Sequence, residues 1–313
     1  MSDRRHRYWL YDMVVESAKP LVLCEARGVE ADEAETWVLE EGAVEFDRGR
    51  LVHDVADFDG KRRLKVWFDG DSLVLLSYGE TGIEWDGRER RIRIDGGDDL
   101  PTRAGIALER MAAPIACMLQ RSGWIALHAS AVGDGDGNAW IFIGNSGAGK
   151  STTAIELNRR GMALLADDLV LLDVSRGELV VATPTVRLFD GPAQVPEATD
   201  RELVMPEIRK YWYRLPDDAH HGGSRASVRG VFSLEPRVEA KACAIEEVRG
   251  RAATVRLLSQ SFDLTEAPAR WKKERFRAVC EFVRRARVWR VEYPKSGRGR
   301  PVQVEALSEF LRE

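Results

Sequence analysis

The sequence predicts an α/β domain preceded by a β-rich N-terminal domain, and three observations support this fold class. A glycine-rich loop at 144–151 lies between a short apolar run at 139–143 and a helix-forming segment. A second apolar run, at 162–166, ends in two adjacent aspartates. Before residue 100, strand-length apolar pieces alternate with turn residues instead of helical patterns.

The first 100 residues are typical of short strands joined by turns. The expected strands are Leu21–Leu23, Val44–Phe46, Leu64–Phe68, Ser72–Tyr78 and Arg91–Ile94. The segment 96–101 then breaks the pattern, so we expect a β-rich domain over 1–100, with a role in substrate recognition, and the α/β domain over 101–313. A helix at 104–119, kinked by Pro114, opens the second domain.

The second domain alternates strand and helix patterns. The expected strands are 124–132, 139–143, 162–166, 169–174, 179–182, 228–234 and 287–293, and the expected helices are 151–160, 265–286 and 305–312. Thr265 is the expected N-cap of the longest helix. The polar stretch 191–227 is typical of a mobile loop.

Composition indicates a soluble protein with one large or two ordinary domains. The chain has 313 residues, 44% hydrophobic content and a formal net charge of −4, which gives no basic bias toward nucleic acid or anionic membranes. No uncharged run approaches the roughly 20 residues that span a bilayer. The four cysteines include no Cys-x-x-Cys pair, as expected of free thiols in a reducing compartment. We expect a cytoplasmic protein that binds neither nucleic acid nor membrane.

The glycine-rich loop matches G-x-x-x-x-G-K-[ST] at every position. Glycines let such a loop turn its N–H groups toward phosphate oxygens, and the helix that follows adds a favourable dipole. We expect it to bind ATP with Mg²⁺, with Lys150 on the β and γ phosphates and Ser151 on the metal. The expected nucleotide-binding residues are Gly144, Asn145, Ser146, Gly147, Ala148, Gly149, Lys150, Ser151 and Thr152.

Asp167 and Asp168 end the next apolar strand, and Asp168 follows Lys150 by 18 residues. Phosphoryl transfer needs a carboxylate on the metal, and another one often orients or deprotonates the acceptor hydroxyl. Motor, transporter and recombinase-type ATPases place their acidic strand much further along, and the GTPase motif Asn-Lys-x-Asp does not occur. Adjacent aspartates should also repel, which raises the pKa of one of them.

His128 lies on the expected strand before the loop strand. A lone histidine on a strand is more often a packed or surface residue. However, neighbouring strands deliver side chains to the same edge of a sheet, so His128 is also a candidate for the site. Arg187 is a further candidate, since it follows the expected hairpin around Ser175–Glu178 and would approach the transferred phosphoryl group. Lys210 and Arg214 either contact the acceptor or coat a loop.

These residues together resemble a known family. The motifs Leu127-His128, Gly144-x4-Gly-Lys-Ser, Arg160-Gly161 and Leu165-Ala-Asp-Asp168 are similar to the catalytic domain of HPr kinase/phosphorylase, and more so to its stand-alone serine kinase relatives, including lasso peptide precursor kinases. The resemblance implies a P-loop kinase fold of the HPr kinase and phosphoenolpyruvate carboxykinase type. It also implies Mg²⁺ on Ser151 and Asp168, with Asp167 as the acceptor base and His128 beside it.

The chain departs from the family at one segment and in the front domain. The family carries a Glu-Ile-Arg-Gly type segment that adds a metal-site glutamate, and the nearest match here is Ser227-Val-Arg-Gly230. Residues 1–100 do not resemble the front domain of the bacterial regulator kinase, which makes HPr itself a poor candidate substrate.

The expected function is transfer of the γ-phosphoryl group of ATP to a serine or threonine hydroxyl of a protein or peptide, with a natural-product precursor peptide as one option. One alternative is a small-molecule kinase of the shikimate-kinase type or a free serine kinase, although those loops usually lie at the extreme N-terminus. Another is an ATP-sensing regulator without enzymatic activity. Assembly into a homo-oligomer stays open.

Overall fold

The computed structural model describes residues 5–27, 29–56, 63–77, 81–95, 123–182, 185–189, 195, 200–205, 210–215, 224–295 and 299–312. The expected helix at 104–119 therefore lies outside the described residues. The chain forms two compact units: one comprises Met1–Arg121, Gly222–Ser224 and Asp263–Lys273, and the other comprises Ser122–His221, Arg225–Phe262 and Glu274–Glu313.

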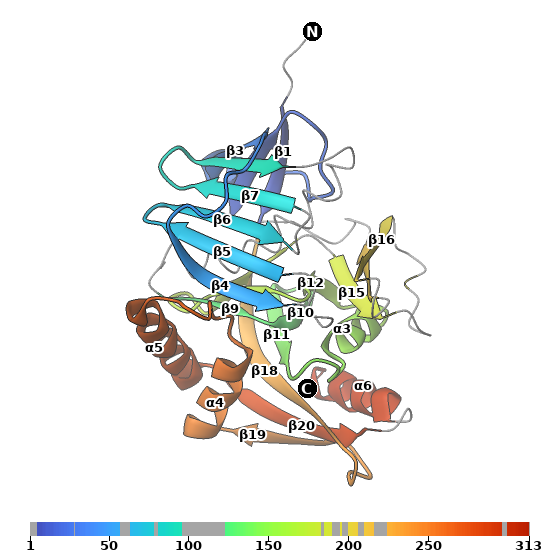
Figure 1. Cartoon of the computed structure of the whole chain (residues 1–313). Coiled ribbons are helices and arrows are strands. Elements are labelled where there is room, and N and C mark those ends of the chain that lie inside the picture. The colour runs from blue at the N-terminus through green and yellow to red at the C-terminus, as the bar shows by residue number, and fades with distance from the viewer. Residues whose placement is uncertain are drawn as a thin grey trace. The chain divides into compact units, whose positions relative to one another are not determined.

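The N-terminal unit is built on one eight-stranded sheet in the order β1-β2-β3-β8-β7-β6-β5-β4 (Figure 1). Its elements are β1 (His6–Leu10), β2 (Met13–Ser17), α1 (Val29–Glu33), β3 (Glu35–Glu41), β4 (Arg50–Ala56), β5 (Arg63–Asp69), β6 (Ser72–Ser77), β7 (Thr81–Asp86) and β8 (Arg91–Asp95). Strand β3 pairs in parallel with β2 and β8, and the other neighbours are antiparallel.

Three of the expected N-terminal strands are confirmed as β5, β6 and β8. The segments 21–23 and 44–46 are not strands. Their apolar side chains are used for packing instead: Leu23 is fully buried, and Val44 packs with Trp67 in a small apolar cluster. Short apolar runs thus mark buried residues correctly without fixing the backbone conformation.

Both outer strands of this sheet bond to chain segments outside it. The N–H of Trp9 in β1 donates to the carbonyl of Cys24 (2.8 Å), and on β4 the carbonyl of Val52 accepts the N–H of Glu266 (2.9 Å). Such bonds satisfy backbone groups that an exposed edge would offer to another strand. Peptide capture on an edge of the described sheet would have to displace them.

The second unit contains a nine-stranded mixed sheet, a three-stranded sheet and most of the helices. The large sheet comprises β9 (Trp124–Leu127), β10 (Ala129–Gly133), β11 (Asn138–Ile143), β12 (Ala163–Ala166), β13 (Val170–Asp173), β14 (Glu178–Val180), β18 (Arg225–Arg237), β19 (Ala244–Val248) and β20 (Val288–Pro294). Its order is β12-β10-β11-β18-β14-β13-β9, and β20 joins β18 in parallel and β19 in antiparallel fashion. The small sheet comprises β15 (Thr185–Phe189), β17 (Lys210–Arg214) and β16 (Asp200–Met205), with β17 in the middle.

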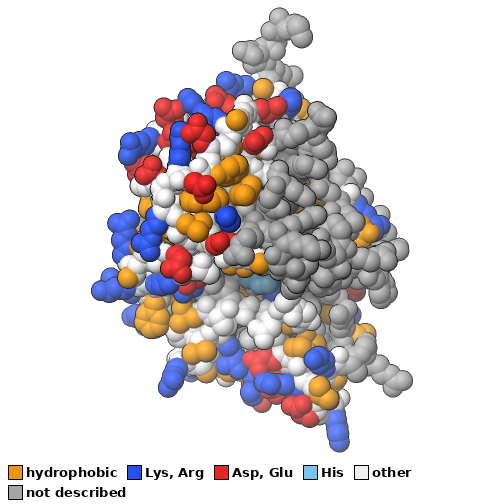
Figure 2. All heavy atoms as spheres, viewed as in Figure 1, with side chains coloured by type: hydrophobic (Ala, Val, Ile, Leu, Met, Phe, Trp, Pro, Cys, Tyr) orange, Lys and Arg blue, Asp and Glu red, His pale blue; other side chains and the backbone are white. Residues whose placement is uncertain are grey.

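The helices of this part of the chain are α3 (Lys150–Asn158), α4 (Gly250–Gln260), α5 (Ala269–Arg285) and α6 (Gly299–Phe310). Figure 1 shows α3 and α6 on one side of β11 and β18 and α4 on the other. The described fold is therefore α/β with mixed sheets. Among the described residues, no helix is long and apolar enough to cross a bilayer. Figure 2 shows acidic and basic side chains interspersed on the face in view, between hydrophobic and neutral areas.

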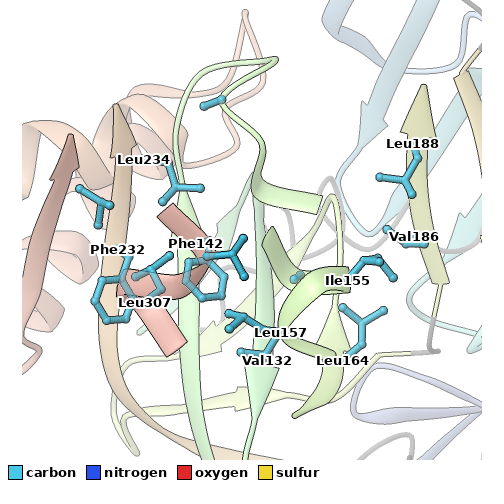
Figure 3. Packing of buried hydrophobic residues seen from close by; sticks show 14 of the residues in the cluster. Val132, Phe142, Ile155, Leu157, Leu164, Val186, Leu188, Phe232, Leu234 and Leu307 are labelled. Atoms are coloured by element: carbon cyan, nitrogen blue, oxygen red, sulfur yellow. The ribbon is translucent and has the colours of Figure 1, made fainter. Parts of the chain in front are cut away.

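The main core of the second unit holds α3 against the sheet. Phe142 of β11 and Phe232 of β18 stack at 5.7 Å between ring centroids, and Leu157 of α3 and Leu307 of α6 pack beside them (Figure 3). Each of these side chains is at most 1% exposed. Full burial of one such side chain contributes about 1.5–3 kcal/mol, so the helix that follows the glycine loop is firmly placed.

Several expected elements differ from the structure. The expected strand 124–132 is broken at His128, whose N–H donates to the carbonyl of Gln260 instead of joining a ladder. The expected loop 191–227 contains β16 and β17, and helix α4 was not expected. Helix α5 begins at Ala269, directly after Pro268, because proline fits the start of a helix. Thr265 therefore does not cap it, and its N–H donates to Nδ1 of His53 (3.2 Å).

Candidate functional site

The glycine loop joins the end of β11 to the start of α3. Gly144, Gly147 and Gly149 have φ angles of 152°, 81° and 89°, which residues other than glycine rarely adopt. A Cβ at Gly144 would also lie 2.7 Å from the carbonyl oxygen of Leu234. Both the conformation and the close approach require glycine, so the motif folds as the turn that the sequence predicts.

The other loop residues divide into an exposed tip and a buried base. Asn145, Ser146 and Gly147 are exposed, whereas Ala148 is buried. Lys150 is only 7% exposed, and its Nζ donates to the carbonyl of Gly144 (2.8 Å). Ser151 and Thr152 follow it in the first turn of α3 and are partly exposed. The Lys150 ammonium group thus lies against the loop, and a bound phosphate would offer it a charged hydrogen-bond acceptor.

Asp167 lies directly after β12 and accepts two hydrogen bonds. One comes from the hydroxyl of Ser130 on the adjacent strand β10, and the other comes from the backbone N–H of Arg187 (2.9 Å). Burial, and then the charge of Asp168, raise the pKa of Asp167, while these hydrogen bonds act in the opposite sense. The repulsion expected between the adjacent aspartates is therefore present, with desolvation as the larger cause.

Asp168 contacts a different set of groups. Its carboxylate forms an ion pair with the guanidinium of Arg187, and His128 Nε2 lies 3.6 Å from its Oδ1. The backbone of Asp168 is left-handed, with φ 68°, a conformation that aspartate tolerates better than most residues. This turn directs neighbouring carboxylates to different partners. Asp168 is 30% exposed and His128 is 45% exposed, whereas Arg187 is 9% exposed.

The fold explains how these residues meet. Antiparallel pairing of Ala131 with Ala166 brings β10 beside β12, which places Ser130 next to Asp167. His128 occupies the break just before β10, and Arg187 lies on β15. Direct contacts thus link Asp167, Asp168, His128 and Arg187, and Ser151 lies close enough to lower the pKa of Asp167. Lys150 precedes Ser151 on the same helix.

Ser130 is the site residue that sequence reasoning missed. It is completely buried, on a strand whose other residues are alanine, valine and glycine. A hydroxyl in such a strand needs a partner, because an unpaired buried polar group costs about 1–3 kcal/mol. That requirement was the available signal, and the partner is Asp167.

The segment 227–230 lies away from this cluster. Ser227 pairs with Asn138 near the start of β18, whereas the glycine loop leaves the sheet next to Ser233. Six residues of strand separate these positions, or roughly 20 Å, so the segment 227–230 is not at the loop. Arg214 pairs with Thr185, two residues before Arg187, and the side chain of Lys210 lies outside what the structure describes. In the described part of the chain, no group of three or more His, Cys, Asp or Glu side chains is placed to hold a metal ion.

Comparisons with known proteins add little to this geometry. No family model matches the chain, and no curated protein matches it. Among solved structures, the chain is similar to the Hpr(Ser) kinase/phosphatase from Coxiella burnetii, with 14% sequence identity and a TM-score of 0.31. The match covers 60% of this chain and 97% of that one. Values this low assign no role to any residue of this chain.

Proposed function

We propose that this protein is an ATP-dependent phosphotransferase that moves the γ-phosphoryl group to a serine or threonine hydroxyl of a protein or peptide, as the motifs shared with HPr-kinase-like serine kinases suggest. The observation that carries the proposal is the division of partners between two adjacent carboxylates. Asp167 lies close enough to Ser151 of the glycine loop for the Ser151 hydroxyl to lower its pKa. Asp168 contacts His128 and Arg187. A transferase needs one carboxylate on the phosphate side and one on the acceptor side.

The glycine loop and Lys150 provide the phosphate site of the proposed enzyme. The first N–H groups of α3 have no partner within the helix and carry the positive end of its dipole. Lys150 exchanges its bond to the Gly144 carbonyl for charged phosphate oxygens, which are stronger acceptors. These residues position the nucleotide and neutralise its charge, which is the main task in phosphoryl transfer.

Ser151 and Asp167 fit a magnesium ion. Both offer hard oxygen donors, and they lie close enough for the Ser151 hydroxyl to lower the pKa of Asp167. Mg²⁺ usually binds one or two carboxylates together with water and substrate phosphates, so it does not need a larger cluster of protein ligands. When bound, it would neutralise charge on the phosphates. The family resemblance implies Asp168 as the metal ligand and Asp167 as the base, but the proximity of Asp167 to Ser151 supports the reverse assignment.

Asp168 is then the proposed acceptor base. It is partly exposed, so an incoming hydroxyl can reach it, and it would take the proton of that hydroxyl during transfer. Arg187, which pairs with Asp168, would balance negative charge on the transferred group. His128, on the other side of the same carboxylate, would orient it. The exposure of Asp168 and His128 suits an acceptor carried on a larger chain.

The test is transfer of labelled γ-phosphate from ATP to peptides with serine or threonine, compared with a panel of free metabolites that includes serine. We expect label on the peptides, loss of transfer in Asp168→Asn with ATP binding retained, and weakened dependence on Mg²⁺ in Asp167→Asn. Asp71→Asn is the control, because Asp71 pairs with Arg88 in the N-terminal unit. Label on a free metabolite alone would favour a small-molecule kinase. ATP binding with no labelled acceptor would favour an ATP-sensing regulator.

A further inference from the structure

Side chains from the last 21 residues of the chain support two consecutive carbonyls at the end of the glycine loop, one directly and one through Thr153. The phenol of Tyr293, at the end of β20, donates to the carbonyl of Ala148. The carbonyl of Gly149 accepts both the N–H of Thr153 (2.8 Å), as the first bond of α3, and the hydroxyl of Thr153 (2.8 Å). Gln303 of α6 in turn donates through Nε2 to the Thr153 oxygen (2.9 Å). Tyr293 acts directly on the loop, and Gln303 acts through Thr153.

The planarity of the peptide bond gives these contacts a consequence for phosphate binding. In a trans peptide the C=O and the N–H point in opposite directions. A bond that fixes the Ala148 carbonyl therefore also fixes the direction of the Gly149 N–H. In the same way, the bonds that Thr153 donates to the Gly149 carbonyl fix the direction of the Lys150 N–H. Both N–H groups are held pointing away from the C-terminal residues.

Glycine makes this support necessary. Gly149 has φ 89° and carries no side chain to oppose a rotation of the peptides on either side of it. A loop of this kind can present either a carbonyl or an N–H to an anion, and only the N–H is attractive. Tyr293, Gln303 and Thr153 are at most 3% exposed. Their fixed positions select the orientation that presents N–H groups.

We infer that Tyr293 and Gln303 are positioning residues for the phosphate site: they hold the Ala148–Gly149 and Gly149–Lys150 peptides with their N–H groups directed toward a bound phosphate. This inference rests on the proposed function of the loop and extends it to residues that no sequence motif marks. It also gives β20 and α6 a role in nucleotide binding. The expected effect is confined to the phosphates and does not involve the base or the sugar.

The experiment measures the Kd of the full-length chain for ATP and for inorganic pyrophosphate, with the unfolding midpoint recorded without ligand. Tyr293→Phe removes only the hydroxyl. Tyr8→Phe is the matched control, since its buried hydroxyl accepts the N–H of Leu21 (2.9 Å) in the N-terminal unit. We expect Tyr293→Phe to weaken both ligands by the same factor, about five- to thirty-fold. Tyr8→Phe should leave both Kd values unchanged. It should lower the unfolding midpoint by about as much as Tyr293→Phe does.

Gln303→Leu is the second variant, and it should weaken both ligands in the same manner but less, because it acts through Thr153. Wild-type Kd values in Tyr293→Phe and Gln303→Leu, with only a lowered midpoint, would overturn the inference and leave the proposed function standing. An unmodified chain that binds neither ATP nor pyrophosphate would overturn the proposed function instead. A loss for ATP without a loss for pyrophosphate would also contradict the positioning role.

Discussion

The imidazole Nε2 of His128 lies 3.6 Å from Oδ1 of Asp168, on a carboxylate that also pairs with Arg187. Asp168 is thus held between two basic side chains that come from separate segments of the chain. Such a contact restricts the carboxylate without removing it from solvent, since 30% of the Asp168 side chain remains exposed.

Replacement of His128 should slow transfer and spare nucleotide binding. We expect His128→Ala to lower the rate of phosphoryl transfer by about 10- to 100-fold, because the acceptor carboxylate loses an orienting partner. The Kd for ATP should change by less than about twofold, since His128 is not part of the phosphate-binding loop. Steady-state kinetics and a binding titration check both values. His6→Ala, an exposed histidine of the N-terminal unit, is the control, and equal losses in the two variants would contradict the role of His128.

Replacement of Lys150 should remove tight nucleotide binding. Hydrogen bonds to charged groups contribute about 1.5–3 kcal/mol, so Lys150→Ala should weaken ATP by roughly 10- to 150-fold. Calorimetric titration measures this directly. Lys241→Ala changes an exposed lysine and should bind ATP normally. A Lys150→Ala variant with unchanged affinity would show that the loop does not hold the phosphates.

His53 should make the stability of the N-terminal unit depend on pH. Burial lowers the pKa of His53 below 6.5, although the charges of Asp54 and Asp263 act in the opposite sense. A lowered folded-state pKa means that the unfolded chain binds the proton more tightly. The contribution to stability is therefore full above about pH 6.5 and is lost as the pH falls through the folded-state pKa. Protonation of Nδ1 would also remove the acceptor of the Thr265 N–H.

This prediction is tested by measuring the midpoint of thermal unfolding between about pH 7.5 and pH 5. His53→Asn keeps a hydrogen-bond acceptor but does not titrate there, so its midpoint should fall less steeply than that of the unmodified chain. His6→Asn should retain the original slope. If His53→Asn retained it as well, His53 would not be the group responsible.

Leu307 should be essential for the packing of α6 against the sheet. It is fully buried among Phe142, Phe232 and Leu157. Truncation to alanine leaves a cavity and should lower the free energy of unfolding by about 2–5 kcal/mol. Val302→Ala on the same helix affects a side chain that is 43% exposed, and it should cost under about 1 kcal/mol. Denaturant titration distinguishes the two, and equal costs would contradict this account of the core.

The sequence predicts those parts of the site that are local in the chain. The glycine loop and Asp167-Asp168 are contiguous motifs, and their flanking strands follow from apolar runs of strand length. Ser130 was missed because its role depends on a strand pairing between β10 and β12 that leaves no local pattern. Similarity of the segment 227–230 to a family motif likewise says nothing about which end of strand β18 it occupies.

Non-local pairing also explains most of the missed fold. Strand β3 pairs in parallel with both β2 and β8, so its register is set by residues far away in the sequence. Strand β17 lies in a turn-rich stretch, and its pairing with β15 and β16 overrides that local preference. The contacts of Asp167 and Asp168 with different partners depend on one left-handed residue, which composition and periodicity do not reveal.

The bond between the Glu266 N–H and the Val52 carbonyl has a practical consequence for dissecting the protein. Residues 263–273 come late in the chain, yet they belong to the N-terminal unit, where Trp271 also packs edge-on against Phe68 at 5.0 Å. A fragment that ends near residue 100 would lack this segment and expose the outer strand β4 to pairing between molecules. A fragment of the first 100 residues is therefore not a complete folding unit, and its aggregation would reflect the missing segment 263–273 instead of an intrinsic instability of the sheet.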